Sequence, residues 1–256
     1  MPANRLSIIL ALALGTILAL SADTTEAQSL NIALEAPAGA VVRSSGDVFG
    51  QLSTLLTARG HTVTIVDGQG LDSQSKINVY DVVVLHGSGY ITDYDWAAFD
   101  PYIVSYVTGG GGLVNSGWGV YEIAQRPTEF EGLEAALPFF TSTAFFLGGA
   151  VTLVSGHPIT DGLTGFSLPS YDAYGAGPKP GATVLSKHGT TPDSAAWELG
   201  GGRVVYFGPI FVAGWETYNH SSMLDGSVPD AQELFLRAVE WAGGGVPPCL
   251  PRPNGA

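Results

Sequence analysis

The sequence predicts an α/β protein with an open, mostly parallel sheet, helices on both faces, and a C-terminal β-hairpin followed by a final helix. Three observations predict this class. Strand-length apolar runs alternate with helix-length amphipathic stretches between residues 30 and 125. The strand expected at 80–85 contains the unbroken apolar run 82–85, which is typical of a parallel strand covered on both faces. Three glycines at 200–202 separate two further apolar runs, as in a hairpin whose turn needs positive φ angles.

The first half of the chain repeats strand and helix. The amphipathic stretch at 47–59 stops at Gly60, a usual helix end. The next helix, 92–108, begins with Thr92 as its cap, and we expect Pro101 to split it. The expected strands are 30–34, 61–66, 80–85 and 112–116, and the expected helices are 47–59, 92–108 and 120–125.

The rhythm loosens after residue 126. Strands are expected at 150–154 and 183–186, and the hairpin pairs 195–199 with 203–207. Pro229 then opens a last helix, which runs to Trp241 with one apolar face.

The N-terminus has the pattern of a secretory signal peptide, predicted at 1–27, in which Arg5 precedes an apolar run. That run is shorter than the ~20 residues of a membrane span, so no span is expected once the signal is removed. The sequence therefore predicts a secreted protein, periplasmic or extracellular, with one domain at 28–243 and a Pro-rich tail at 244–256.

The single cysteine, Cys249, lies in that tail, so an internal disulfide is excluded. Cys249 can bridge two chains or remain an unpaired thiol, and the oligomeric state is left open.

Charge and motif content exclude several classes of partner. Ten Lys and Arg stand against 23 Asp and Glu, and the net charge of −13 disfavours nucleic-acid binding. No Cys and His cluster suggests a metal, and the glycine run at 109–112 lacks the Gly-Lys-Ser/Thr of a phosphate loop. No cofactor is expected, and a small molecule or carbohydrate is the favoured partner.

Several motifs occur in a familiar order along most of the chain, at 59–63, 80–85, 109–116, 157–163 and 202–208. In this order and spacing the chain resembles the class I glutamine amidotransferase-like superfamily, in its exported, trehalose-utilisation-like branch. The resemblance implies a flavodoxin-like sheet with a ligand cleft at the carboxyl ends of its strands.

The sequence departs from the family at the nucleophile. The family places a reactive Cys in a sharp turn after the fourth strand, and the matching position here is Gly117. The family's His and Glu partners are also missing, because no His-x-Glu pair precedes the last helix. Glutamine hydrolysis by the family mechanism is therefore excluded.

Ser116 and His86 are the candidate catalytic residues, because each is expected where a neighbouring strand ends. A serine hydrolase would need Ser116, a histidine and an acid within hydrogen-bond reach. Alternatively, Ser116 satisfies the turn backbone and His86 bonds nearby backbone. Other candidate bases are His157, His188 and His220, and the candidate orienting acids are Glu122, Asp161 and Asp172.

The candidate ligand-binding residues follow the same strand ends, and they are Gly87, Ser88, Gly89, Tyr90, Gly117, Trp118 and Glu122. Aromatic residues gather around the presumed cleft, where their rings suit sugar stacking, although core burial is the alternative for each ring. These aromatics are Tyr90, Tyr94, Trp96, Trp118, Tyr121, Tyr171, Tyr174, Trp215 and Tyr218.

Two further patterns favour structure over chemistry. The segment 157–162 has the residues of an ordinary turn. Asp93 and Asp95 are better explained by helix-start electrostatics than by a cation site.

Three functions remain. The first, which the absence of a catalytic set favours, is a catalytically degenerate domain that serves as a binding or surface-assembly module. The second is an extracellular hydrolase or carbohydrate-processing enzyme that uses Ser116 and a histidine. The third is a structural domain that docks on a larger complex through its tail.

Overall fold

The computed structural model describes residues 28–36, 48–87, 95–168, 172–209, 211, 224 and 227–245. The predicted signal peptide at 1–27, and Cys249 with residues 246–256 of the tail, lie outside the described residues. The domain boundaries therefore stay a prediction. Among the described helices, none is long and apolar enough to cross a bilayer.

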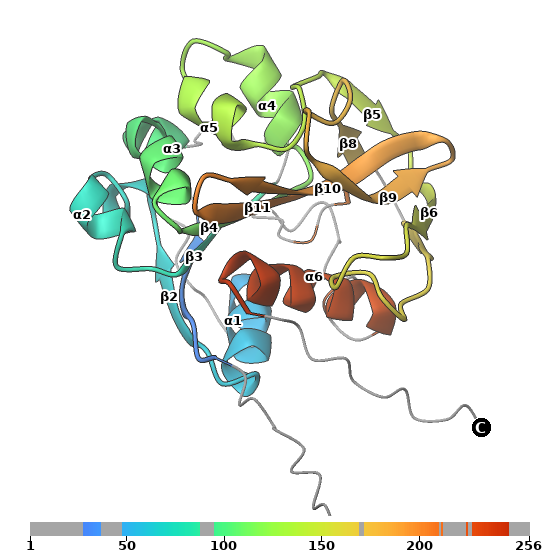
Figure 1. Ribbon diagram of the computed structural model, residues 1–256, viewed down its shortest axis with the longest axis horizontal. Helices are drawn as coiled ribbons and strands as arrows, with labels where there is room; N and C mark the ends of the chain where they lie inside the picture. Colours follow the sequence, from blue (N-terminus) through green and yellow to red (C-terminus); the bar gives the residue numbers. More distant parts are fainter. Residues whose placement is uncertain are drawn as a thin grey trace, which may run out of the picture.

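A nine-stranded sheet organises the molecule, and the predicted flavodoxin-like α/β class is confirmed (Figure 1). The first five strands in sheet order run parallel, and the last four continue antiparallel. In sheet order the strands are β2 (Thr62–Val66), β1 (Asn31–Glu35), β3 (Val82–Val84), β4 (Gly112–Ser116), β11 (Gly202–Phe207), β10 (Thr191–Leu199), β9 (Thr183–His188), β6 (Gly149–Leu153) and β7 (Phe166–Leu168).

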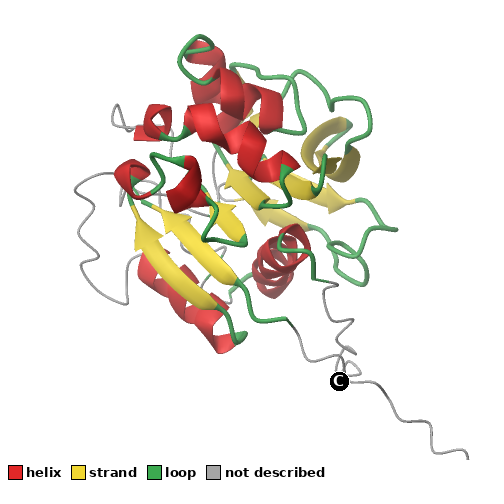
Figure 2. Cartoon of the chain, turned by 60° about the vertical axis from the view of Figure 1, so that its left-hand side comes forward, coloured by secondary structure: helices red, strands yellow, loops and turns green. Residues whose placement is uncertain are grey.

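Helices cover both faces of the sheet (Figure 2). Alternate residues of β1 and β3 point to opposite faces, so Ile32 and Val82 pack in one apolar cluster and Ala33 and Val83 in another. Helices α1 (Val48–Ala58) and α6 (Pro229–Ala242) supply the first cluster. The second face carries α2 (Gln74–Ile77), α3 (Asp100–Thr108), α4 (Gly119–Gln125) and α5 (Glu131–Ala136).

Most predicted elements occur within a few residues of their expected bounds. The hairpin is confirmed: β10 and β11 pair antiparallel, and Gly200 at the turn has a φ of +64°. The described part of the helix expected at 92–108 is divided just before Pro101, as expected, and Pro101 lies in the first turn of α3, where a missing N–H costs nothing. A short 3₁₀ helix, η2 (Asp95–Ala98), precedes it. Several short elements were not predicted from the sequence: α2, α5, β7, the 3₁₀ helix η1 (Gly68–Gly70) and a two-stranded sheet of β5 (Ala144–Phe146) and β8 (Asp172–Tyr174).

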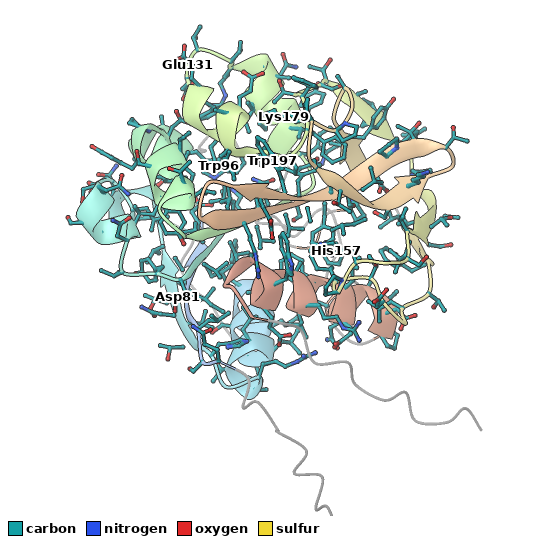
Figure 3. The ribbon with its side chains drawn as sticks, viewed as in Figure 1. Asp81, Trp96, Glu131, His157, Lys179 and Trp197 are labelled. Atoms are coloured by element: carbon teal, nitrogen blue, oxygen red, sulfur yellow. The ribbon has the colours of Figure 1, made fainter. Side chains whose placement is uncertain are left out.

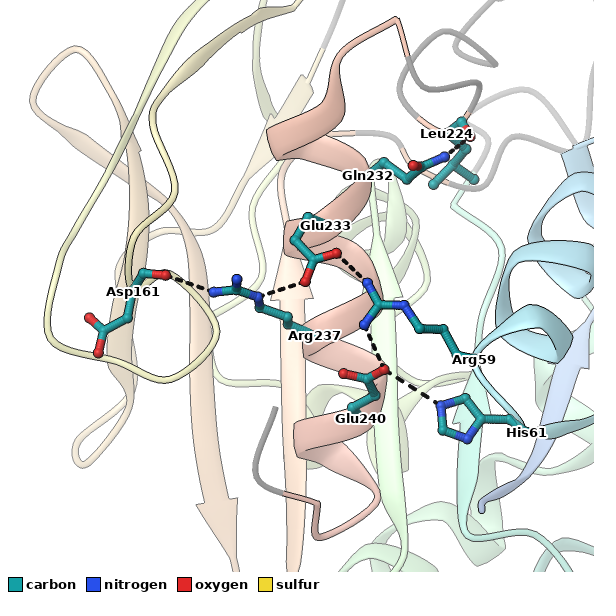
Figure 4. A network of polar contacts seen from close by, with 8 residues as sticks. All are labelled: Arg59, His61, Asp161, Leu224, Gln232, Glu233, Arg237 and Glu240. Atoms are coloured by element: carbon teal, nitrogen blue, oxygen red, sulfur yellow. Dashed lines mark hydrogen bonds and ion pairs between the residues drawn. The ribbon is translucent and has the colours of Figure 1, made fainter. Parts of the chain in front are cut away.

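A network of charged side chains joins α6 to the amino edge of the sheet, just before β2 (Figure 4). Arg59 pairs with Glu233 and with the buried Glu240, whose Oε1 lies 3.1 Å from Nη1. His61 Nε2 lies 3.7 Å from the same Glu240 oxygen, and Arg237 Nε donates to Glu233 at 2.8 Å. Each glutamate of the network therefore contacts an arginine.

Candidate functional site

The carboxyl edge of the parallel strands brings together side chains that are far apart in the sequence. Glu35 is the last residue of β1, His86 follows β3 by two residues, and Ser116 ends β4. β1 and β3 are neighbours, but α1 follows β1 on one face while η2 and α3 follow β3 on the other. The site therefore lies at a topological switch point, where open α/β sheets bind ligands.

Glu35 and His86 form a fully buried pair at this point. His86 Nδ1 lies 2.5 Å from Glu35 Oε2, and both side chains are 0% exposed. The same oxygen accepts a hydrogen bond from Trp96 Nε1 at 3.1 Å and a longer one from the His86 backbone N–H at 3.4 Å. Trp96 lies between the sheet and the helices of its second face (Figure 3). The orienting partner of His86 is thus Glu35, which the sequence analysis did not name.

Glu35 has a histidine, and no arginine or lysine, as its basic neighbour among the described residues. Its Oε1 has no hydrogen-bond partner among these residues. Burial, together with the negative charge of Glu35, raises the pKa of Asp95, whose Oδ2 accepts from Gly68 N at 2.8 Å. Two acids thus lie near one another in a partly dehydrated region, which is unfavourable for stability.

The turn after β4 has a tight backbone geometry. Gly117 has a φ of +68°, and its N–H donates to Phe207 O at 2.7 Å. A Cβ atom on Gly87 would lie 1.4 Å from Ser116 O, so the two strand ends touch through their backbones. The Trp118 N–H donates to Gly87 O at 2.9 Å. Gly117 therefore occupies a sharp strand-to-helix turn, at the position the resemblance assigns to the nucleophile, and it has no side chain.

Ser116 is fully buried, and its Oγ accepts a hydrogen bond from Phe211 N at 3.3 Å. Its strand lies beside β3, as expected, but among the described residues no hydrogen bond joins Ser116 to His86. Ser116 is held as part of the backbone turn in this structure. Its catalytic role stays a prediction.

Half-buried rings lie beside the turn. Trp118 packs against Tyr121 with ring centroids 5.0 Å apart, and against Phe145 at 5.5 Å. Phe145 is 44% exposed, whereas Trp96 belongs to the core. Tyr174 instead stacks on Phe146 in the small sheet. The other aromatics predicted for the cleft, Tyr90, Tyr94, Tyr171, Trp215 and Tyr218, lie outside the described residues.

Of the remaining candidates, Glu122 lies one helical turn after Trp118, and the other described ones lie away from the Gly117 turn. Glu122 is half-buried on α4 beside Arg126, and burial raises its pKa despite this neighbour. Asp161 Oδ1 accepts from Gly156 N at 3.0 Å, within the turn predicted at 157–162. His157 in the same turn packs on Trp241 of α6, 5.0 Å between centroids (Figure 3). The side chain of Asp172 is not described, and Ser88, Gly89, Tyr90 and His220 lie outside the described residues. His188 stacks on Phe146.

The polar edge continues onto the antiparallel strands. Ser116 pairs in register with Phe207, and Phe207 pairs with Ser194. The buried Asp193 accepts hydrogen bonds from Ser186 Oγ at 2.5 Å and Ser194 Oγ at 3.3 Å. No group of three or more His, Cys, Asp or Glu suited to a metal occurs within the part of the chain that the structure describes.

No protein-family model and no curated protein matches this chain. Solved structures share its fold at low sequence identity. A cytoplasmic protein from Salmonella typhimurium is similar with a TM-score of 0.60 and 14% identity, over 83% of this chain and 98% of that one. A ThuA-like protein from Bacteroides uniformis gives 0.54 and 17%, over 86% and 93%. A protein described as a GMP synthase subunit, from Thermoplasma acidophilum, gives 0.51 and 14%, over 85% and 95%. The chain therefore shares its flavodoxin-like α/β fold with these proteins, among them a ThuA-like protein.

Proposed function

We propose that this chain is an exported, catalytically degenerate domain of the amidotransferase-like fold, which binds a carbohydrate at the carboxyl edge of its sheet and does not hydrolyse glutamine. Three described features support binding there: a switch point, polar strand ends, and half-buried rings beside a glycine turn.

The turn at Gly117 carries the proposal. In a hydrolase of this fold the residue at the turn attacks the substrate, and its strained backbone exposes the reactive side chain. Gly117 keeps the positive φ but offers no nucleophile. The next residue, Trp118, presents an aromatic ring that packs edge-on against Tyr121. Aromatic faces bind the apolar faces of sugar rings, so the geometry favours binding over cleavage.

A hydrolase that uses Ser116 and a histidine is the second candidate. One observation favours it, because Ser116 and His86 follow neighbouring strands at the same edge. Two observations oppose it. The Ser116 hydroxyl is buried, which limits its access to a substrate. Its oxygen also accepts a hydrogen bond from the Phe211 N–H, which makes it less nucleophilic.

The binding test is calorimetric titration of the mature chain with glucose, galactose, mannose, maltose, cellobiose and trehalose. Trp118→Ala should weaken binding of any sugar that binds by about tenfold, the value of one stacking contact. The matched control is Trp197→Ala, because Trp197 is another half-buried tryptophan, on β10 beside Lys179. Equal losses in both variants, or no binding by the wild type, would contradict the proposal.

The catalytic test uses ester, amide and glycoside substrates with wild type and Ser116→Ala. A binding module should turn over none of them, and Ser116→Ala should change sugar affinity by no more than a hydrogen bond, ~0.5–1.5 kcal/mol. Turnover that collapses in Ser116→Ala would establish the hydrolase instead.

The export part rests on residues 1–27. The mature chain should be recovered outside the cytoplasm with its N-terminus near Gln28. Recovery there of chains that begin at Met1 would overturn signal cleavage.

A further inference from the structure

One carboxylate oxygen at the switch point gathers three donors. Glu35 Oε2 faces His86 Nδ1 at 2.5 Å, Trp96 Nε1 at 3.1 Å and the His86 backbone N–H at 3.4 Å. All three side chains are fully buried. Hydrogen bonds are stronger in a buried, low-dielectric environment, so the two side-chain contacts at 2.5 and 3.1 Å favour one position of the imidazole and the indole against Glu35.

The contact with Nδ1 has a chemical consequence for the imidazole. A neutral imidazole carries one proton, and a carboxylate partner places that proton on Nδ1. The Nε2 atom is then the hydrogen-bond acceptor of the ring. The centroid of this ring lies 5.7 Å from that of Trp96 and 6.5 Å from that of Phe49, which restricts its rotation.

The same contacts connect Glu35 to the turn. His86 is followed by Gly87, whose carbonyl accepts the Trp118 N–H at 2.9 Å. Gly87 also abuts the Ser116 carbonyl so closely that no side chain fits between them. A shift of His86 would therefore move Gly87, and the hydrogen bond that Gly87 accepts would pass this movement to the backbone of Trp118.

We propose that Glu35 is a positioning residue of the ligand site: it holds His86 as the Nδ1–H tautomer and thereby fixes the segment from His86 to Gly87 against Trp118. This inference rests on the proposed function for its ligand, a neutral sugar. Glu35 acts through His86 and does not itself touch the ligand.

The first arm of the test requires no ligand. Imidazole nitrogen resonances of the ¹⁵N-histidine-labelled mature chain should show one Nδ1–H histidine with a proton protected from exchange, absent in His86→Gln. In Glu35→Gln the protection of this proton should fall at least about tenfold, because a neutral amide is a weaker acceptor than a carboxylate. An Nε2–H tautomer for His86, or a proton unaffected by Glu35→Gln, would overturn the assignment.

The second arm measures sugar affinity. Glu35→Gln should weaken it by about three- to tenfold, the value of one hydrogen bond. The matched control is Glu240→Gln, which neutralises another buried carboxylate at the opposite edge of the sheet. Glu240→Gln should lower the melting temperature and leave the affinity within about twofold of wild type, inside the usual scatter for a distant site. Equal affinity losses in both variants would show a purely structural role for Glu35.

A gentler variant covers the case in which Glu35→Gln does not fold. Trp96→Phe removes one of the three donors to Glu35 and keeps a ring in the core. It should leave the Nδ1–H tautomer in place, and loss of the tautomer would contradict the assignment to Glu35. If the wild type binds no sugar, the proposed function fails and the ligand part of this inference fails with it, while the tautomer experiment still decides whether Glu35 holds His86.

Discussion

The two edges of the parallel sheet provide different partners for their acidic side chains. At the amino edge, Glu233 and Glu240 each contact Arg59, and Arg237 adds a second cation to Glu233. At the carboxyl edge, no arginine or lysine of the described chain pairs with Glu35, whose basic neighbour is His86. Among the described residues, one oxygen of Glu35 and one oxygen of Glu240 lack a hydrogen-bond partner, so the edges differ in their cations and not in this respect. Paired charges limit the cost of burial, whereas an unbalanced carboxylate reduces stability. The acids of the first edge pair with arginines and so join α6 to the start of β2, whereas the acid of the second edge contacts a histidine and a tryptophan of the core.

The space around the backbone also differs between the two edges, as one glycine at each edge shows. Gly60, before β2, has a φ of +90° and open space around the position of a Cβ atom. Gly87, after β3, has no space, because the missing Cβ would lie 1.4 Å from Ser116 O. One glycine is required by its conformation and the other by close contact between two strand ends.

The largest effect should come from exchanging these glycines for alanine. Gly87→Ala should cost at least about 3 kcal/mol of unfolding free energy, or prevent folding, because backbone atoms must move apart. Gly60→Ala should cost about 1–2 kcal/mol, the strain of a positive φ for an L-residue. Urea unfolding of both variants tests the contrast, with circular dichroism for a variant too unstable to titrate. Equal losses of unfolding free energy in the two variants would mean that the backbone around Gly87 can move apart at little cost.

Removal of the central arginine of the amino edge should have an intermediate effect. Arg59→Met leaves Glu240 buried without its arginine, and we expect a loss of about 2 kcal/mol, since Arg59 itself is 21% exposed. Arg126→Met is the matched control, because the ion pairs of Arg126 at 3.5 and 3.6 Å are longer and more exposed. This control should lose less than about 1 kcal/mol. If Arg126→Met had the lower urea midpoint of the two variants, the ion pairs of Arg59 would not be the more stabilising ones.

The smallest effect concerns the acid beside Glu35. The pKa of Asp95 is raised above its ordinary value of 3.8, chiefly by burial, so the folded state holds this proton more tightly than the unfolded chain does. Stability should therefore decrease as pH rises from about 4 through the raised pKa. Asp95→Asn should abolish that decrease and add less than about 1 kcal/mol at pH 7, because the group is partly exposed. Thermal unfolding at pH 3 and pH 7 measures it, and a variant less stable than wild type at pH 7 would contradict the sign.

The strand framework could be predicted from the sequence because each parallel strand is a local apolar run. The 82–85 run and the glycine turn at 200–202 needed no knowledge of distant residues. The six-residue helix α5 begins at Glu131, and its N-cap residue Phe130 provides no side-chain cap. Strands β7 and β8 have three residues each, so all three elements carry little local signal. Such elements form because the rest of the molecule packs against them.

The site was predictable only in part. His86, Ser116 and Gly117 were identified from their places at strand ends, and the structure puts them at one edge. Glu35 was missed, because its partner His86 lies 51 residues further along the chain and their contact depends on the order of the strands. One signal was available: Glu35 is an acid that follows three apolar residues at the end of a strand. Burial of a charge there is unfavourable without a partner, and such positions are frequent at functional sites.

The position of β11 between β4 and β10 sets the order in which the molecule can be assembled. Leu113 of β4 pairs with Val204 of β11, and this pairing joins the parallel half of the sheet to the antiparallel half. Strands β10 and β11 can pair locally through their short turn, but a nascent chain that stops before Gly202 lacks the strand to which both halves hydrogen-bond. Pairing of the two halves is therefore a long-range event that cannot precede synthesis of β11.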